Sequence, residues 1–220
     1  MNTETLESYT YKLTNSLGIR PCVPKDRLRE LYDKKDFIVM MRYIQKTMEL
    51  EDLEVLIELV DGSDDSDPDP AVAQIFYARY LPPYGSREFR NSSVLVHLEK
   101  KFLRYASFES IVATMAHELS HAILFSTGNE LQKSEEATDI TAMVLGYRDF
   151  FKQKSWYVEP VTTVKYSPEG GILTRMCKKM LNALDHFLKL RICNPGYLKK
   201  KEIRFVAKII DEIVKNKNRD

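Results

Sequence analysis

The sequence predicts an α+β fold, in which a small twisted β-sheet of about three strands precedes two buried helices, with further helices at both ends. Short runs rich in branched and aromatic residues, bounded by turn signals, fall between residues 53 and 99. Apolar residues at helical spacing occupy the chain before and after that interval. The 220 residues suit one compact domain, or a core with a small helical appendage.

The first fifty residues are predicted to be helical. Apolar side chains recur at helical spacing from Leu6 to Leu17, and Gly18 is a natural end for this helix. Two prolines then interrupt the pattern. A second helical region is expected over about residues 25–48, with a break near residues 34–36.

Three strands are expected to form the sheet. The run LEVLIELV at 53–60 ends in an Asp-Gly turn signal, and AVAQIFYARY at 71–80 is closed by the sequence PPYG. In SVLVHLE at 93–99, Val94 and Val96 lie on one face because successive side chains of a strand alternate.

Two helices are expected to follow the sheet. Ser107 can cap a long apolar run that continues to Phe125 without strong helix breakers, so this helix is predicted to be buried. Gly128 fits a C-terminal cap. The next helix is predicted to start near Ser134 and to continue to about Phe151.

The last part of the chain is predicted to be mainly helical. Residues 156–171 read as a loop or an irregular strand, followed by helices over about 171–191 and 199–216. We therefore expect an N-terminal helical segment, a central core and a C-terminal helical segment packed on the core, over residues 1–50, 51–155 and 156–220.

Composition excludes some classes of function. The formal net charge of +1 argues against a dedicated nucleic-acid-binding protein. The three cysteines are widely spaced, which favours reduced thiols and a cytoplasmic protein over a disulfide framework. No secretory signal and no apolar run of about 18 residues is present, so a membrane protein is not expected.

The sequence HELSH at 117–121 is an HExxH motif. Its two histidines, His117 and His121, are four residues apart and share one face of a helix, where both imidazoles can bind one metal ion. Glu118 is rotated away from both and can act as a general base. The alternative is a buried histidine pair satisfied by backbone or carboxylate partners. The apolar surroundings favour the metal, because unpaired polar groups are unfavourable there.

The following helix offers a third ligand. Glu135 and Asp139 are also four residues apart, so Glu135 can face the metal while Asp139 accepts the free ring N–H of His117. Glu136 is a rival ligand, but it has no acidic residue four positions later. The simpler alternative is an acidic first turn that is stabilised by the helix dipole. Two histidines and one carboxylate favour zinc among the metals.

HELSH followed by EEATD at 135–139 resembles the HExxH…ExxxD signature of gluzincin metallopeptidases, and the short chain is similar to the minigluzincin and ImmA/IrrE-like branch. The resemblance covers about residues 53–150 and implies a zincin-like core with one zinc ion per chain. It implies His117, His121 and Glu135 as ligands and Glu118 as base. Leu124 and Thr127 stand where metzincins have glycine and histidine, so that arrangement is excluded.

The expected function is hydrolysis of a peptide or protein substrate bound along the sheet edge. The alternatives are a catalytically silent zinc-stabilised module that binds a peptide or regulates a partner, and a metal-free helical interaction protein. The sequence has no clear counterpart of the downstream histidine that stabilises the oxyanion in thermolysin-like enzymes. The candidates for this role are His186, Tyr147, Tyr157, Tyr166 and Tyr197.

Overall fold

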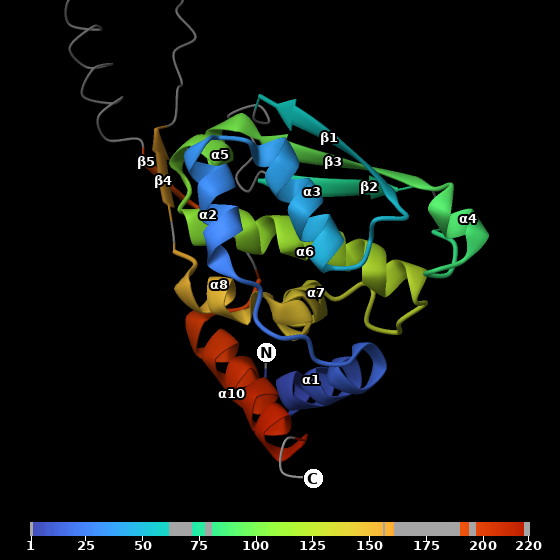
Figure 1. The fold of residues 1–220 in the computed structure, drawn as a ribbon. Helices are drawn as coiled ribbons and strands as arrows, with labels where there is room; N and C mark the ends of the chain where they lie inside the picture. Colours follow the sequence, from blue (N-terminus) through green and yellow to red (C-terminus); the bar gives the residue numbers. More distant parts are fainter. Residues whose placement is uncertain are drawn as a thin grey trace, which may run out of the picture.

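The predicted α+β class is confirmed by a small three-stranded mixed sheet accompanied by several helices (Figure 1). The structure is a computed structural model. The structure describes residues 2–61, 72–77, 81–155, 157–160, 190–193 and 197–217.

The sheet consists of β1 (Glu54–Val60), β2 (Ala73–Tyr77) and β3 (Ser93–Glu99), in the order β1-β3-β2. β1 runs parallel to β3, whereas β2 runs antiparallel to β3. β2 is therefore an edge strand, and its described part is shorter than the run that predicted it. The inner face carries fully buried side chains of β3, namely Val94, Val96 and Leu98.

The N-terminal helices lie where the apolar spacing predicts them. α1 (Thr3–Leu17) ends at Gly18, whose φ of 72° is accessible to glycine at little energetic cost. The expected break near residues 34–36 separates α2 (Lys25–Asp33) from α3 (Phe37–Thr47).

The long central helix is α6 (Phe108–Ser126), and it lies against the sheet (Figure 1). The side chain of Ser107 accepts a hydrogen bond from the N–H of Ser110 at 3.2 Å, so the predicted N-terminal cap is present. Gly128 follows the helix with a φ of 60°. α6 is buried on nearly all sides, because α2, α3, β2 and the next helices all pack on it.

The helix predicted to run from 134 to 151 is not continuous, which corrects that expectation. It consists of α7 (Glu135–Ala142), a π-helical turn η1 (Met143–Tyr147) and α8 (Arg148–Gln153). Gly146 interrupts the α-helical geometry with a φ of 103°.

Contacts with the segment between α1 and α2 stabilise this interruption. The N–H of Val23 donates to the carbonyl of Gly146 at 3.0 Å, and the N–H of Arg20 donates to the carbonyl of Val144 at 3.0 Å. A Cβ atom on Gly146 would lie 2.4 Å from the carbonyl oxygen of Pro21. The interruption therefore depends on glycine both for its dihedral angle and for this close approach.

The C-terminal part is only partly helical in the described residues. α10 (Lys200–Lys217) matches the last predicted helix. β4 (Tyr157–Pro160) pairs antiparallel with β5 (Leu190–Cys193), so the expected helix over 171–191 is wrong at residues 190–191. The rest of that predicted helix lies outside the described residues.

Two short helices were not predicted. They are α4 (Arg87–Arg90), before β3, and α5 (Lys100–Tyr105), directly after it. At four and six residues, both are too short to produce a clear apolar period.

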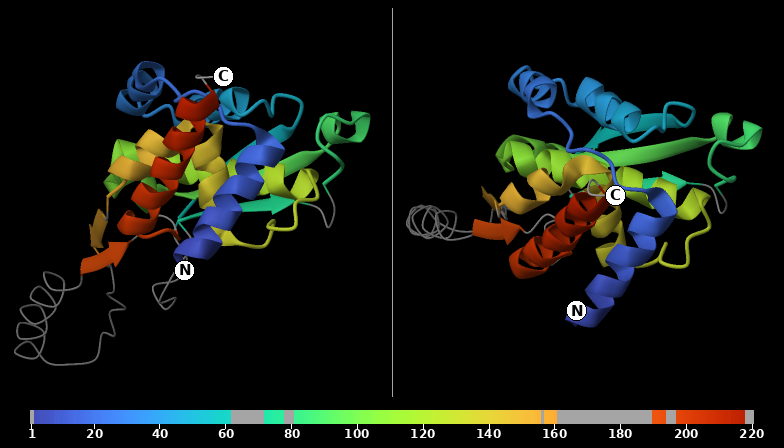
Figure 2. Two further views of the ribbon diagram at one scale, coloured as in Figure 1. Left: turned by 90° about the horizontal axis from the view of Figure 1, so that it is seen from below. Right: turned by 60° about the horizontal axis from the view of Figure 1, so that its bottom comes forward.

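The elements form successive layers. α6 lies between the sheet on one side and α7 and α8 on the other, while α1 and α10 pack together beyond them (Figures 1 and 2). One hydrophobic core extends from Leu6 of α1 to Ile210 of α10. Among the described residues, no helix combines the length and apolarity needed to cross a bilayer.

Candidate metal centre

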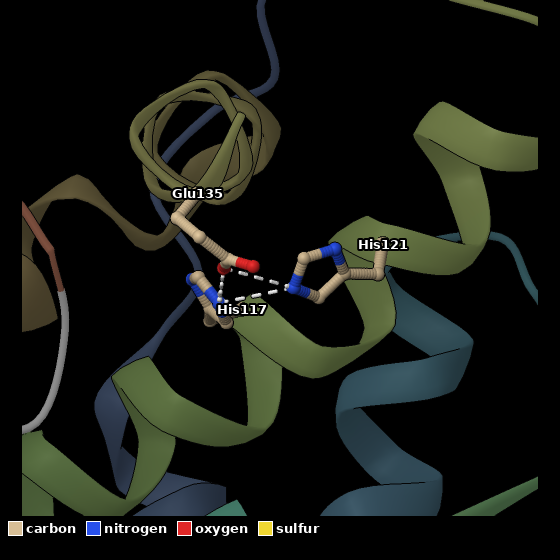
Figure 3. Close-up of side chains that lie close together, drawn as sticks. All are labelled: His117, His121 and Glu135. Carbon is tan, nitrogen blue, oxygen red and sulfur yellow. Dashed lines mark hydrogen bonds and ion pairs between the residues drawn. The ribbon is translucent and has the colours of Figure 1, made fainter. Parts of the chain in front are cut away.

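Two helices bring three potential metal ligands together. His117 and His121 project from α6, and Glu135 projects from the first turn of α7 (Figure 3). Nε2 of His117 lies 3.2 Å from Oε2 of Glu135, and Nε2 of His121 lies 3.2 Å from the same oxygen. The two Nε2 atoms are themselves 3.2 Å apart. The three atoms therefore form a nearly equilateral triangle.

This triangle fits the requirements of a zinc ion. A tetrahedral zinc with ligand bonds of about 2.0–2.1 Å holds its ligand atoms about 3.3–3.4 Å apart. The sides of 3.2 Å in this structure are close to that separation. Two imidazole nitrogens and one carboxylate oxygen also form a donor set that zinc commonly takes in catalytic sites, where a fourth position stays open.

Glu135 joins the cluster, whereas Glu136 bonds to the residue that caps α7. Ser134 caps α7 by accepting a hydrogen bond from the N–H of Ala137 at 3.2 Å, which places Glu135 in the first turn. The hydroxyl of Ser134 also donates to Oε2 of Glu136 at 3.0 Å. Among the described residues, the group of side chains that could hold a metal ion comprises His117, His121 and Glu135.

Asp139 is fully buried and holds the His117 ring. Its Oδ1 accepts a hydrogen bond from Nδ1 of His117 at 2.8 Å, because an ionised carboxylate can only accept. Because Nδ1 is engaged in this way, Nε2 is the ring nitrogen of His117 that faces Glu135 and is available to a metal ion. Asp139 thus lies where the sequence predicted the partner of a ligand histidine.

The structure adds contacts of Asp139 that the sequence did not indicate. Its Oδ2 accepts the backbone N–H groups of Tyr197 at 3.0 Å and Leu198 at 2.9 Å, just before α10. Nζ of the buried Lys154 lies 3.7 Å from the same oxygen. Burial lowers the pKa of Lys154, while the Asp139 carboxylate opposes that change. No short-range pattern links these residues, since they are brought together only by the packing of α8 and α10.

The electrostatics of the cluster favour positive charge. Burial alone would lower the pKa of His117, but hydrogen bonds to the carboxylates of Asp139 and Glu135 outweigh burial and raise it to about 10. Hydrogen bonds from His117 and His121 lower the pKa of Glu135 to about 2. The site therefore stabilises a cation, whether a proton or a metal ion.

Glu118 is buried between α6 and the sheet. Burial raises the pKa of its carboxyl group, and the nearby histidines oppose this effect. The backbone N–H of Ile75 in β2 donates a hydrogen bond to the Glu118 carboxylate. Glu118 therefore points towards the edge strand, whereas the adjacent His117 points towards α7.

The structure places the candidates for oxyanion stabilisation differently relative to the histidines. The ring of Tyr197 stacks on that of His117, with centroids 5.5 Å apart and planes inclined by 22°, and 58% of the residue is exposed. Tyr147 is fully buried and its hydroxyl hydrogen-bonds with Thr47, so it is excluded from this role. The remaining candidates, His186, Tyr166 and the side chain of Tyr157, lie outside the described part of the chain.

Tyr77 is a residue near the site that sequence reasoning did not single out. Its ring centroid lies 4.6 Å from that of Phe125 on α6. Burial raises the pKa of Tyr77, and the charges of Glu135 and Glu118 raise it further. Strand alternation could have placed Tyr77 on the inner face, but only the strand order shows that this face meets α6.

No protein-family model matches this chain, and neither a curated protein nor a solved structure was found to match it. A function for the chain is therefore argued from the geometry of its site.

Proposed function

We propose that this chain is a zinc-dependent metallopeptidase of the gluzincin type, close to the minigluzincin and ImmA/IrrE-like branch, with one zinc ion per chain. The observation that carries the proposal is the triangle of ligand atoms from His117, His121 and Glu135, with sides of 3.2 Å. Retention of Glu118 beside this triangle favours an enzyme, because a purely structural zinc site has no need of a general base.

The chain supplies the proton transfers of peptide hydrolysis through Glu118. A zinc ion, when bound, would polarise the scissile carbonyl and make water acidic enough to lose a proton near neutral pH. Glu118 would accept that proton and later donate it to the leaving amine. Its raised pKa suits both steps, since a group that takes and returns a proton works best with a pKa near the working pH.

The outer edge of β2, with which no described strand pairs, is suited to binding an extended peptide. The carbonyl of Val72 accepts the N–H of Glu99, so the alternation of an antiparallel ladder directs the backbone groups of Ala73, Ile75 and Tyr77 away from β3. Apart from the N–H of Ile75, which faces Glu118, these groups can pair with a substrate strand. Because Glu118 bonds to the N–H of Ile75, the general base lies directly at this edge.

Tyr197 is the residue that we assign to oxyanion stabilisation. Its ring stacks on that of the proposed ligand His117, and its backbone N–H donates a hydrogen bond to Oδ2 of Asp139 at 3.0 Å. A phenol can donate a hydrogen bond to developing negative charge. We also propose a cytoplasmic location and a peptide or protein as the substrate, with no nucleic acid as partner.

The deciding experiment is elemental analysis of the purified protein and of two adjacent variants, Glu135→Ala and Glu136→Ala. We expect one zinc per chain in the wild type, loss of zinc in Glu135→Ala and retention in Glu136→Ala. Absence of metal from zinc-treated wild type would refute the proposal.

Activity is then tested with a peptide library and Glu118→Gln. We expect the wild type to cleave peptides, and we expect the variant to bind zinc without cleaving. A zinc-loaded wild type that binds peptides but cleaves none would instead support a silent binding module. Equal turnover by Glu118→Gln would exclude Glu118 as the base.

A further inference from the structure

Tyr77, the last residue of β2, lies on the face of the sheet that meets α6. It pairs with Val94 of β3, which is buried on the inner face, and directly paired residues share a face. Its ring lies 4.6 Å from Phe125 of α6. Phe125 follows His121 by four residues, so the Tyr77 ring contacts the metal-ligating side of α6 one turn beyond the histidines.

Two carboxylates of the proposed site influence the hydroxyl of Tyr77. The carboxylates of Glu135 and Glu118 come from two different helices, and both act on this one hydroxyl together with its partial burial. These effects raise its pKa, so the hydroxyl keeps its proton at neutral pH and can donate a hydrogen bond.

Tyr77 and Tyr197 bracket the metal-binding turn of α6. Tyr197 stacks on His117, and Tyr77 contacts Phe125, which lies eight residues later and therefore about 12 Å further along the helix. An extended peptide covers about 12 Å with three to four residues. Such a stretch therefore spans the distance along α6 between the two residues that the tyrosines contact.

We infer that Tyr77 is a substrate-contacting residue, whose hydroxyl donates a hydrogen bond to the peptide backbone beside the scissile bond. This inference rests on the proposed peptidase function. It adds a residue that would fix which peptide bond of the substrate lies beside the metal. The backbone groups of Tyr77 face the outer edge of β2, so one residue contacts the peptide through both its main chain and its side chain.

The test compares Tyr77→Phe with Tyr105→Phe, a control at an exposed tyrosine on α5. Tyr77→Phe removes only the hydroxyl and keeps the ring packed on Phe125. The probe is a zinc-directed phosphonamidate peptide, whose dissociation constant is measured by calorimetry on zinc-loaded protein. We expect three- to tenfold weaker binding for Tyr77→Phe, the range for one lost hydrogen bond. Zinc content and Tm should be unchanged, and Tyr105→Phe should match the wild type.

Steady-state kinetics give a second measurement. Tyr77→Phe should mainly raise KM, because the hydrogen bond is made to bound substrate as well as to the transition state, whereas Tyr197→Phe should mainly lower kcat. If the zinc-loaded wild type binds the probe with the same dissociation constant as Tyr77→Phe, this inference alone is overturned. Zinc-loaded wild type that neither binds the probe nor cleaves peptides overturns the proposed function, and this inference falls with it.

Discussion

Replacing Asp139 by asparagine should damage the proposed metal centre without changing a proposed ligand. The carboxylate presents one oxygen to Nδ1–H of His117 and the other to the backbone N–H groups of Tyr197 and Leu198. An asparagine side chain has only one oxygen, so one side must lose its acceptor. If the amide nitrogen faces His117, that ring must accept at Nδ1 and carries its proton on Nε2, where the metal would bind.

The opposite orientation of the amide is also unfavourable. Its NH₂ group would then face the N–H groups of Tyr197 and Leu198 in a fully buried position. Leaving such donors without an acceptor costs about 1–3 kcal/mol. The first orientation leaves no buried donor without an acceptor, so we expect it to be preferred and zinc affinity to fall 10- to 100-fold, as is typical for partners of ligand histidines. A loss of about 1–3 kcal/mol in unfolding free energy would instead indicate the second orientation.

Competition titration with a coloured chelator measures the zinc affinity, and urea unfolding of zinc-free protein measures the stability. Glu136→Gln serves as the matched control, because it removes the same charge from the same helix outside the triad. The reasoning is refuted if Asp139→Asn binds zinc as tightly as Glu136→Gln does.

Three further outcomes are expected. Zinc affinity should fall about tenfold for each pH unit below about 10. The reason is that zinc must displace the proton of His117, whose pKa is raised to about 10. An affinity that does not change with pH would contradict this. Gly146→Ala should lower Tm by roughly 5–15 °C. Gly85 is the control, because its φ is also positive, at 76°, but no atom lies within 4 Å of the added Cβ. Gly85→Ala should therefore lower Tm much less, and equal shifts in Tm would contradict the predicted clash. Glu118→Gln should stabilise zinc-free protein at neutral pH, because an ionised carboxylate with a raised pKa destabilises the fold. This gain should shrink as pH falls through that pKa towards the ordinary value of a glutamate. A gain that stays constant in calorimetric melting at several pH values would contradict this cause.

Much of the fold and the centre of the site could be predicted from local sequence. The four-residue spacings of His117–His121 and Glu135–Asp139 become spatial neighbours because the α-helix has a fixed period. The ends of α1 and α6 followed from Gly18, Ser107 and the apolar spacing, since caps and helical period act over a few residues.

The remaining features depend on contacts between distant segments. Gly146 reads as a tolerated glycine inside a helix, and only its contact with the Pro21 segment shows why the helix is interrupted there. The position of β2 at the sheet edge depends on strand order, which three short apolar runs do not specify. The approach of Lys154, Tyr197 and Leu198 to Asp139 depends in turn on how α8 and α10 pack.

The link between Asp139 and the start of α10 also has a consequence for protein synthesis. Tyr197 is translated 58 residues after Asp139, so the ribosome makes the complete HExxH and ExxxD helices well before the backbone that fixes their geometry. A nascent chain would therefore carry the proposed ligands and Asp139 before the backbone N–H groups of Tyr197 and Leu198 can hold that carboxylate in place. If the site binds metal as proposed, its full affinity would arise only after α10 has emerged and docked, so the proposed peptidase would become active late in synthesis.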